Sequence, residues 1–207
     1  MTPLGIGTLT SVHAVSANDV WAVGTRPVWV GTGTIIHWDG VSWVSVPSPA
    51  GTGDLLSVFM LPGGTDGWAV GDGNPDNIRW GGSWPTGAWV PGPTPNLSTN
   101  ILRSVSLSSP AFGWIVSSGG EIFRWDGTGW NSIAPSPVAG IDMTSVFAIS
   151  GNDAWAVGAG DTIIRWNGAT WTGPMVAPTT GVDYRSIRIV SATDGWIAGS
   201  TDPTSLE

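Results

Sequence analysis

The chain has 207 residues, with 7 Arg, no Lys and 15 acidic residues, for a formal net charge of −8. That sign argues against nucleic acids and anionic membrane surfaces as partners, and the absence of Cys excludes disulfides and thiolate metal sites. No apolar run approaches the roughly 20 residues of a membrane span, so membrane insertion is not expected.

A short tryptophan motif recurs along the chain. It reads Asn-Asp-Val-Trp-Ala-Val-Gly at residues 18–24 and Asn-Asp-Ala-Trp-Ala-Val-Gly at residues 152–158. Variants stand at residues 66–71, 112–116 and 194–199, so that the five Trp occupy positions 21, 68, 114, 155 and 196. A recurrence of this length indicates stacked supersecondary units that bury their faces against one another.

Each unit reads as four short strands. The first has a Ser-Val core (Ser-Ile in the fifth unit), the second is the Trp motif, the third ends at another Trp, and the fourth begins at a further Trp. Asp39-Gly40, Asp126-Gly127 and Asn167-Gly168 lie between the third and fourth strands and predict tight hairpin turns. Four-stranded antiparallel units of this length predict the blades of an all-β propeller, in which the Trp side chains fill the space between neighbouring sheets.

The last unit is incomplete. We expect a single domain over residues 1–207, with repeats at about 9–54, 55–100, 101–141, 142–182 and, in part, 183–200. The fifth blade would then hold only its first two strands and expose a strand edge, which invites pairing with another chain. Two explanations stay open: the chain is a fragment of a longer propeller, or a second copy covers the edge in a homo-oligomer.

The repeat pattern resembles that of many exported bacterial β-propellers. It is also distantly similar to the photosystem II assembly-factor propellers, which share a Gly-Trp-Ala-Val-Gly strand, an Asp-Gly turn and a following Trp, as residues 66–71 illustrate here. The sialidase Asp-box is a further relative, but residues 39–43 lack its Ser and its Asp-Gly spacing. The resemblance implies a propeller fold and names no ligand.

Two insertions interrupt the repeat, and each contains a Trp outside the repeated framework. Trp29 and Arg26 lie in the first, at residues 25–33, and Trp84 lies in the second, at residues 82–88. A loop Trp can stack on a sugar ring or an aromatic side chain, so these three residues are the expected ligand-binding set. The alternative is that each loop folds its Trp back against a blade.

Other polar positions are better explained by structure than by chemistry. Arg79, Arg124 and Arg165 share one repeat position with His37, where a cation can pair with an Asp turn or stack on Trp. Residues 72–77 have the oxygen spacing of a calcium loop but no following Glu, so that a polar turn explains them equally well.

Hydrolytic chemistry finds little support in the residues present. A glycosidase of sialidase type needs an Arg cluster, a Tyr nucleophile and a Glu, and Tyr184 is the only Tyr while Glu121 is the only internal Glu. His13 and His37 belong to different strands, with no nucleophile implied by their spacing. We therefore expect no catalytic residue, no metal and no cofactor.

The sequence thus predicts a non-catalytic binding module. Glycan or surface-ligand binding through the loop aromatics is the first expectation. A protein-interaction or assembly scaffold is the second, and a propeller fragment without independent activity is the third. The Gly-, Thr-, Ser- and Trp-rich composition favours an extracellular or cell-surface location in a bacterium.

Overall fold

The computed structural model describes residues 6–27, 31–93, 97–175, 180–191 and 194–201. Across these residues the regular structure consists of β-strands, with no helix. Accordingly, no described segment forms a helix that could cross a membrane. The chain divides into two compact units, residues 1–102 and 103–207, which are described in turn.

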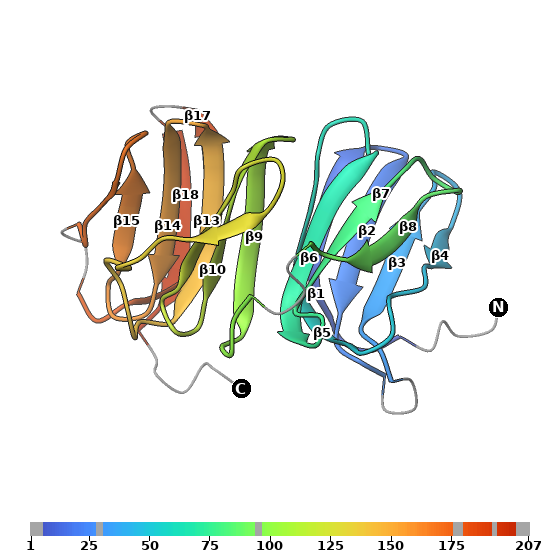
Figure 1. The fold of residues 1–207 in the computed structure, drawn as a ribbon, viewed down its shortest axis with the longest axis horizontal. Helices are drawn as coiled ribbons and strands as arrows, with labels where there is room; N and C mark the ends of the chain where they lie inside the picture. Colours follow the sequence, from blue (N-terminus) through green and yellow to red (C-terminus); the bar gives the residue numbers. More distant parts are fainter. Residues whose placement is uncertain (1–5, 28–30, 94–96, 176–179, 192–193, 202–207) are drawn as a thin grey trace. The chain divides into compact units, whose positions relative to one another are not determined.

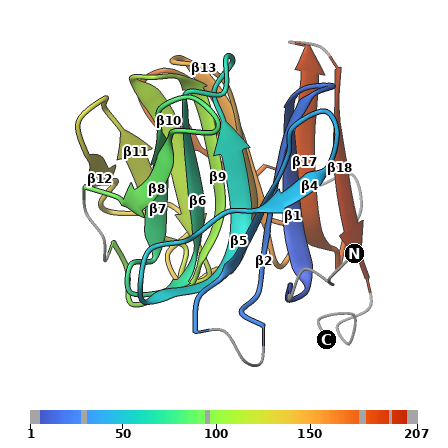
Figure 2. The same cartoon turned by 90° about the vertical axis from the view of Figure 1, so that its right-hand side faces the viewer.

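The first unit contains two four-stranded antiparallel sheets (Figure 1). Blade 1 comprises β1 (Leu9–Ser16), β2 (Asp19–Gly24), β3 (Thr34–Trp38) and β4 (Trp43–Ser45). Blade 2 comprises β5 (Thr52–Met60), β6 (Asp66–Gly73), β7 (Asn77–Gly81) and β8 (Ala88–Pro91). In both sheets the strands pair in chain order, and the β5–β8 meander can be followed from teal (β5) to green (β8) in Figure 2.

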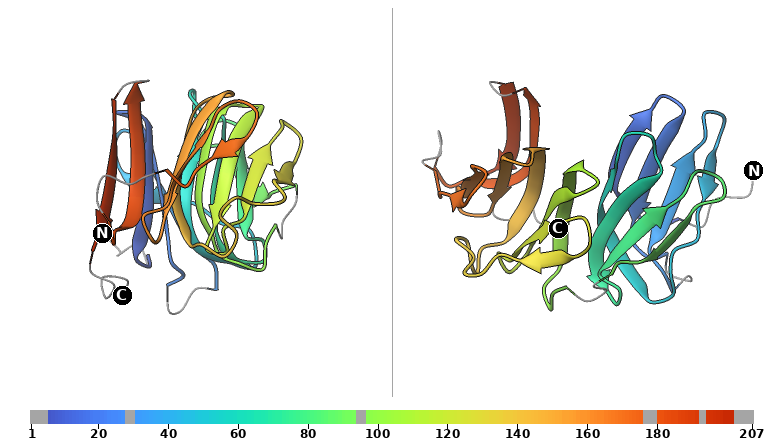
Figure 3. Two further views of the ribbon diagram at one scale, coloured as in Figure 1. Left: turned by 90° about the vertical axis from the view of Figure 1, so that its left-hand side faces the viewer. Right: turned by 45° about the horizontal axis from the view of Figure 1, so that its top comes forward.

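The second unit contains two further complete blades and a two-stranded sheet (Figure 3). Blade 3 comprises β9 (Leu102–Ser109), β10 (Phe112–Ser117), β11 (Ile122–Trp125) and β12 (Trp130–Ser132), and blade 4 comprises β13 (Met143–Ser150), β14 (Asp153–Gly158), β15 (Ile163–Trp166) and β16 (Trp171–Thr172). Half-blade 5 consists of β17 (Asp183–Ser191) and β18 (Asp194–Ser200). This confirms the predicted propeller architecture of four complete blades and a fifth with two strands.

The predicted hairpin turns are confirmed between the third and fourth strands. Gly40, Gly127 and Gly168 have φ values of +93°, +95° and +96°, a conformation that glycine adopts without a steric cost. The residue before each glycine accepts hydrogen bonds from the turn. Asp39, for example, accepts from the N–H groups of Val41 and Ser42 at 2.8 and 2.9 Å.

Tryptophan rings fill the space between adjacent blades, as the repeat predicts. In the first unit the ring of Trp21 lies 4.6 Å from that of Trp80 and 5.7 Å from that of Trp89. In the second unit Trp114 lies 4.9 Å from Trp166 and 4.8 Å from Trp171. In each pair of blades, the Trp of a second strand therefore packs against the third- and fourth-strand Trp of the following blade.

A serine at one repeat position links the first strands of adjacent blades. The N–H groups of Val58, Val146 and Ile187 donate to the hydroxyl oxygens of Ser11, Ser104 and Ser145, respectively, each at 3.2 Å. The Val or Ile whose N–H donates is 4% exposed in all three cases. The repeated Ser and Val thus connect adjacent blades in two ways. The Ser hydroxyl accepts a hydrogen bond from the next blade, and the Val or Ile that donates it is buried.

Candidate functional site

A layer of acid–cation pairs joins the second and third strands of the complete blades. The Asp66 carboxylate accepts two hydrogen bonds from Arg79, both at 2.8 Å. Asp153 accepts two from Arg165, at 2.9 and 3.0 Å. The hydrogen bonds that it donates to Asp66 raise the pKa of the Arg79 guanidinium, because they stabilise its charged form. These pairs join neighbouring strands of one sheet.

Blades 1 and 3 have different residues at the positions of this acid–cation pair. In blade 1, His37 Nε2 lies 2.8 Å from the Asp19 carboxylate. In blade 3, Phe112 stands where the other blades have Asp, and the Arg124 guanidinium lies 4.7 Å from its ring centroid. In blades 2 and 4 the Arg forms an ion pair and also lies over a Trp ring, at 5.5 Å for Arg79 and 5.0 Å for Arg165. The first residue of the second strand therefore decides whether an ion pair accompanies the cation–π contact.

The structure ties Arg26, one of the expected ligand-binding residues, to the neighbouring blade. Its backbone N–H donates to the Asp54 carboxylate at 2.7 Å, and its Nε donates to the same oxygen at 3.2 Å. Trp29, expected beside it, lies outside the described residues. A ligand role for this pair stays a prediction.

Trp84 folds back against the blades of the first unit. Its ring lies 4.3 Å from that of His37 and 6.1 Å from that of Trp21, and it packs on the cluster between blades 1 and 2. The insertion that contains it thus follows the alternative given above, a loop whose Trp caps a blade. The ring is partly buried in this packing, and ligand binding by Trp84 stays a prediction.

The polar residues weighed for metal binding or catalysis have local structural partners. Asp76 accepts from the N–H groups of Leu97 and Ser98 at 2.8 and 3.1 Å, and burial raises the pKa of its carboxyl. The Ser117 hydroxyl donates to Glu121 at 2.9 Å. Within the described part of the chain, no three His, Cys, Asp or Glu side chains gather where they could hold a metal.

The open edge of β18 differs from every corresponding strand. β18 pairs with β17 on one side, and no strand pairs with its other side among the described residues. Trp196 is 71% exposed, whereas Trp21 and Trp114 at the same repeat position are fully buried. Ile197 is also exposed. The strand therefore presents backbone hydrogen-bonding groups beside large apolar side chains.

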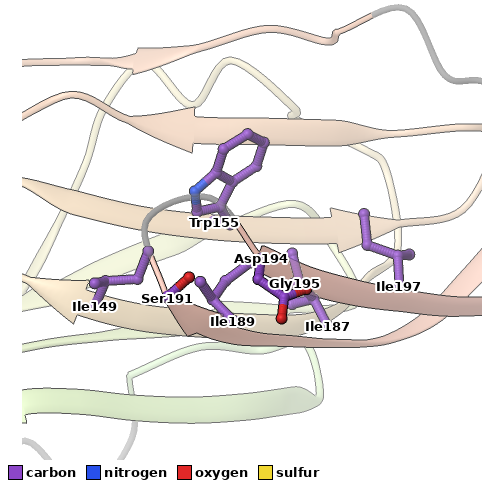
Figure 4. A pocket seen from close by; sticks show the side chains of 8 residues that line it. All are labelled: Ile149, Trp155, Ile187, Ile189, Ser191, Asp194, Gly195 and Ile197. Carbon is purple, nitrogen blue, oxygen red and sulfur yellow. The ribbon is translucent and has the colours of Figure 1, made fainter.

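A cavity of about 300 Å³ lies on the face of half-blade 5 that borders blade 4 (Figure 4). Trp155 of β14 forms one part of its wall, and the rest comes from β13, β17 and β18. The lining residues are Ile149, Trp155, Ile187, Ile189, Ser191, Asp194, Gly195 and Ile197. The walls are thus mostly apolar, with one carboxylate-bearing residue at the edge.

A second apolar surface lies on blade 1. A depression of about 550 Å³ is lined by Ile6, Leu9, Thr10, Ser11, Val12, Ala22, Ile36 and Trp43. Val12 is 66% exposed here, in contrast to 4% for Val58 at the same repeat position. This surface has no charged residue in its lining, so the edge of β18 offers more of the features that give a binding site specificity.

Comparisons with known proteins support the fold. No protein-family model matches this chain, and no curated protein sequence matches it. The solved structure of YCF48 from Cyanidioschyzon merolae matches with a TM-score of 0.69 and 16% identity over 97% of this chain and 69% of that one. The likeness confirms a β-propeller, the fold that the resemblance of the repeats implies.

Two further propellers match as well. The WD40 β-propeller domain of Doa1 matches with a TM-score of 0.64 and 15% identity over 92% of this chain, which spans 62% of that domain. A structure of YCF48 bound to D1 peptide matches with a TM-score of 0.47 and 16% identity over 93% of this chain and 75% of that one. At these identities the likeness concerns the fold alone, and the last match is too distant to carry an argument.

The sequence predicts an exposed strand edge in the fifth blade, but it does not mark Asp194 or Trp196 on that edge as binding residues. Asp194 and Trp196 belong to the repeat and therefore read as framework. The signal that could have identified them was present, because the fifth unit repeats the second strand but lacks the third. Asp194 and Trp196 are exposed because no described third strand covers them, whereas the corresponding residues of the complete blades are covered.

Proposed function

We propose that this chain is a non-catalytic protein-interaction module that binds an extended segment of a partner protein at the open edge of β18. The observation that carries the proposal is that edge, with Trp196 and Ile197 exposed along it. An extended peptide that adds a strand to a sheet edge gains main-chain hydrogen bonds, and adjacent cavities select its side chains. The cavity beside Trp155 supplies such a selecting feature.

Protein interaction is favoured over glycan binding by the open edge and by the packing of one loop Trp. Trp84 packs on His37 and Trp21, and Trp29, the other loop Trp, lies outside the described residues. Several propellers share the fold, but their identities are too low to transfer a partner. The proposal therefore rests on the surface of this chain.

The test is a selection of binders from a random peptide library on the whole chain. We expect the selected peptides to compete with one another and to protect β18 amides from hydrogen exchange. Binding should be lost in Ile197→Lys, which places a charge on the edge strand. The matched control is Val190→Lys, because Val190 is 68% exposed on β17 and does not line the cavity.

Two results would refute the proposal. One is a set of peptides whose binding leaves β18 exchange unchanged. The other is saturable binding of a free sugar that survives Ile197→Lys and depends on Arg26, which would restore the glycan-binding expectation.

A further inference from the structure

The complete blades show what a strand on the open side of β18 has to supply. In each of them, one third-strand residue lies opposite the second-strand Trp: His37 opposite Trp21, Arg79 opposite Trp68, Arg124 opposite Trp114 and Arg165 opposite Trp155. That residue is a cation or an imidazole in all four blades. In blade 4 its guanidinium also lies 5.0 Å from the Trp155 ring centroid.

β18 presents the acidic half of this arrangement, and no third-strand cation accompanies it among the described residues. On its paired side Arg188 of β17 lies opposite Trp196, with its guanidinium 4.9 Å from the Phe147 ring centroid. Asp194 and Trp196 occupy the positions that Asp153 and Trp155 hold in β14. Among the described residues, no group pairs with the Asp194 carboxylate, and both side chains are exposed. An Arg on an added strand, opposite Trp196, would meet the carboxylate and the indole face together.

The cavity on the other face of β18 indicates a second feature that an added strand has to supply, namely aromatic rings that pack on Trp155. Trp21 and Trp114 each pack against the third- and fourth-strand Trp of the following blade. Trp155 is the corresponding residue of blade 4, and it lines an open cavity instead (Figure 4). The rings that would pack on Trp155 belong to the third and fourth strands of half-blade 5, which no described residue supplies.

The register places those rings at the cavity. The third-strand Trp lies opposite a small residue in three blades, namely Gly67, Gly113 and Ala154. The residue at this position in β18 is Gly195, which lines the cavity. Because neighbouring residues of a strand point to opposite faces, a consecutive Arg-Trp pair sends Arg toward Asp194 and Trp toward Trp155.

We infer that the partner segment is an extended strand with the pattern apolar–apolar–Arg–Trp, followed by a tight turn and a second Trp. The inference rests on the proposed function and names the partner's chemistry. Charge complementarity at Asp194 selects the Arg, and the cavity beside Trp155 selects the aromatic rings. The segment of this chain that fits the description, residues 162–172 of blade 4, provides a ready probe.

The experiment titrates the whole chain with a labelled synthetic peptide that copies residues 162–172. Saturable binding with protection of β18 amides is expected. Binding should weaken about fivefold in Asp194→Asn, as befits one partly exposed charge-assisted pair. Replacing both Trp of the peptide by Ala should weaken it at least about thirtyfold, because buried Trp side chains dominate such contacts.

A charge exchange provides the matched control. The peptide with Arg165→Glu should bind the parent chain poorly and should bind the Asp194→Arg chain better than the parent peptide does. Asp194 makes no contact that folding requires among the described residues, so both variants should keep the parent's thermal unfolding midpoint. Because the two peptides are compared on the same two chains, the result tests the charge pairing between residue 194 and the peptide independently of the absolute affinity.

The outcomes separate the two proposals. If the Arg and Glu peptides bind the parent chain equally and both lose binding in Ile197→Lys, the Arg–Trp inference is overturned while binding at the edge stands. If no peptide protects β18, or if sedimentation shows a second copy covering the edge, both proposals fail.

Discussion

At the scale of single residues, the residue that opens each second strand decides how the third-strand cation is held. Asp66 and Asp153 hold Arg in two-bond contacts, and Phe112 holds Arg124 by its ring face. Asp194 has the same position, and among the described residues no third strand brings a cation to it. One repeated residue type thus has a structural role in the complete blades and a binding role, under our proposal, in half-blade 5.

Asp66→Asn should lower the free energy of unfolding by about 0.5–1 kcal/mol, because the pair with Arg79 is charge-assisted but partly exposed. Urea unfolding measures the change. Asp194→Asn is the matched control and should leave the stability unaltered. Equal effects of the two substitutions would contradict a structural role for the pair.

Asp126 should make the stability of the chain depend on pH. The Thr128 hydroxyl, followed by the N–H groups of Thr128 and Gly129, holds the pKa of Asp126 well below its ordinary value of 3.8. A depressed folded-state pKa contributes stability above the unfolded pKa, and this contribution is lost as the pH falls through the folded-state value.

Asp126→Asn converts this turn to the type that Asn167 forms in blade 4. The difference in urea midpoint between the parent and this variant should therefore be largest near neutral pH and should shrink at pH values below 3.8. Asn167→Ala, which changes no titratable group, should lower the midpoint equally at all pH values. A parent–variant difference that is constant with pH would refute the assignment.

At the scale of strands and loops, contacts between consecutive blades determine which side chains remain accessible. The Trp84 insertion packs against the blades of the first unit, and the Ser-Val position links the first strands of neighbouring blades within each unit. Among the described residues no strand follows β18 in its sheet, and β18 is exposed along nearly its whole length.

Trp84→Ala should lower the free energy of unfolding by about 2 kcal/mol, since a partly buried ring is removed from a packed cluster. Trp43→Ala is the control of matched chemistry, and the smaller effect expected there follows from its 39% exposure. Thermal or urea unfolding distinguishes the two. Unchanged stability in Trp84→Ala would reopen a ligand role for this ring.

Ser145→Ala should lower the free energy of unfolding by about 1 kcal/mol. The substitution removes the hydroxyl that accepts a hydrogen bond from the Ile187 N–H, between blade 4 and half-blade 5. Ser186 has the same repeat position in β17 and is exposed, so Ser186→Ala should be neutral. Unfolding of the two variants under one condition compares them directly. A neutral Ser145→Ala would show that the hydroxyl does not hold half-blade 5.

At the scale of the whole molecule, net charge opposes self-association at the open edge. The chain carries a charge of −8, so that two copies repel each other when salt does not screen them. We expect sedimentation at low ionic strength to give a monomer at all concentrations. A concentration-dependent dimer under that condition, lost in Ile197→Lys, would make a second copy the occupant of the edge.

The sequence by itself determined the repeat, the four strands of each complete blade, the glycine turns and the incomplete fifth blade. These features follow from local periodicity and cross-strand register, both of which can be predicted from the spacing of residues along the chain. Only the tertiary structure decided that Trp84 packs on His37, that Arg26 is tied to Asp54, and that Asp194 and Trp196 are accessible. The reason is physical: a side chain's exposure depends on which distant residue fills the space beside it, and spacing along the chain does not contain that information.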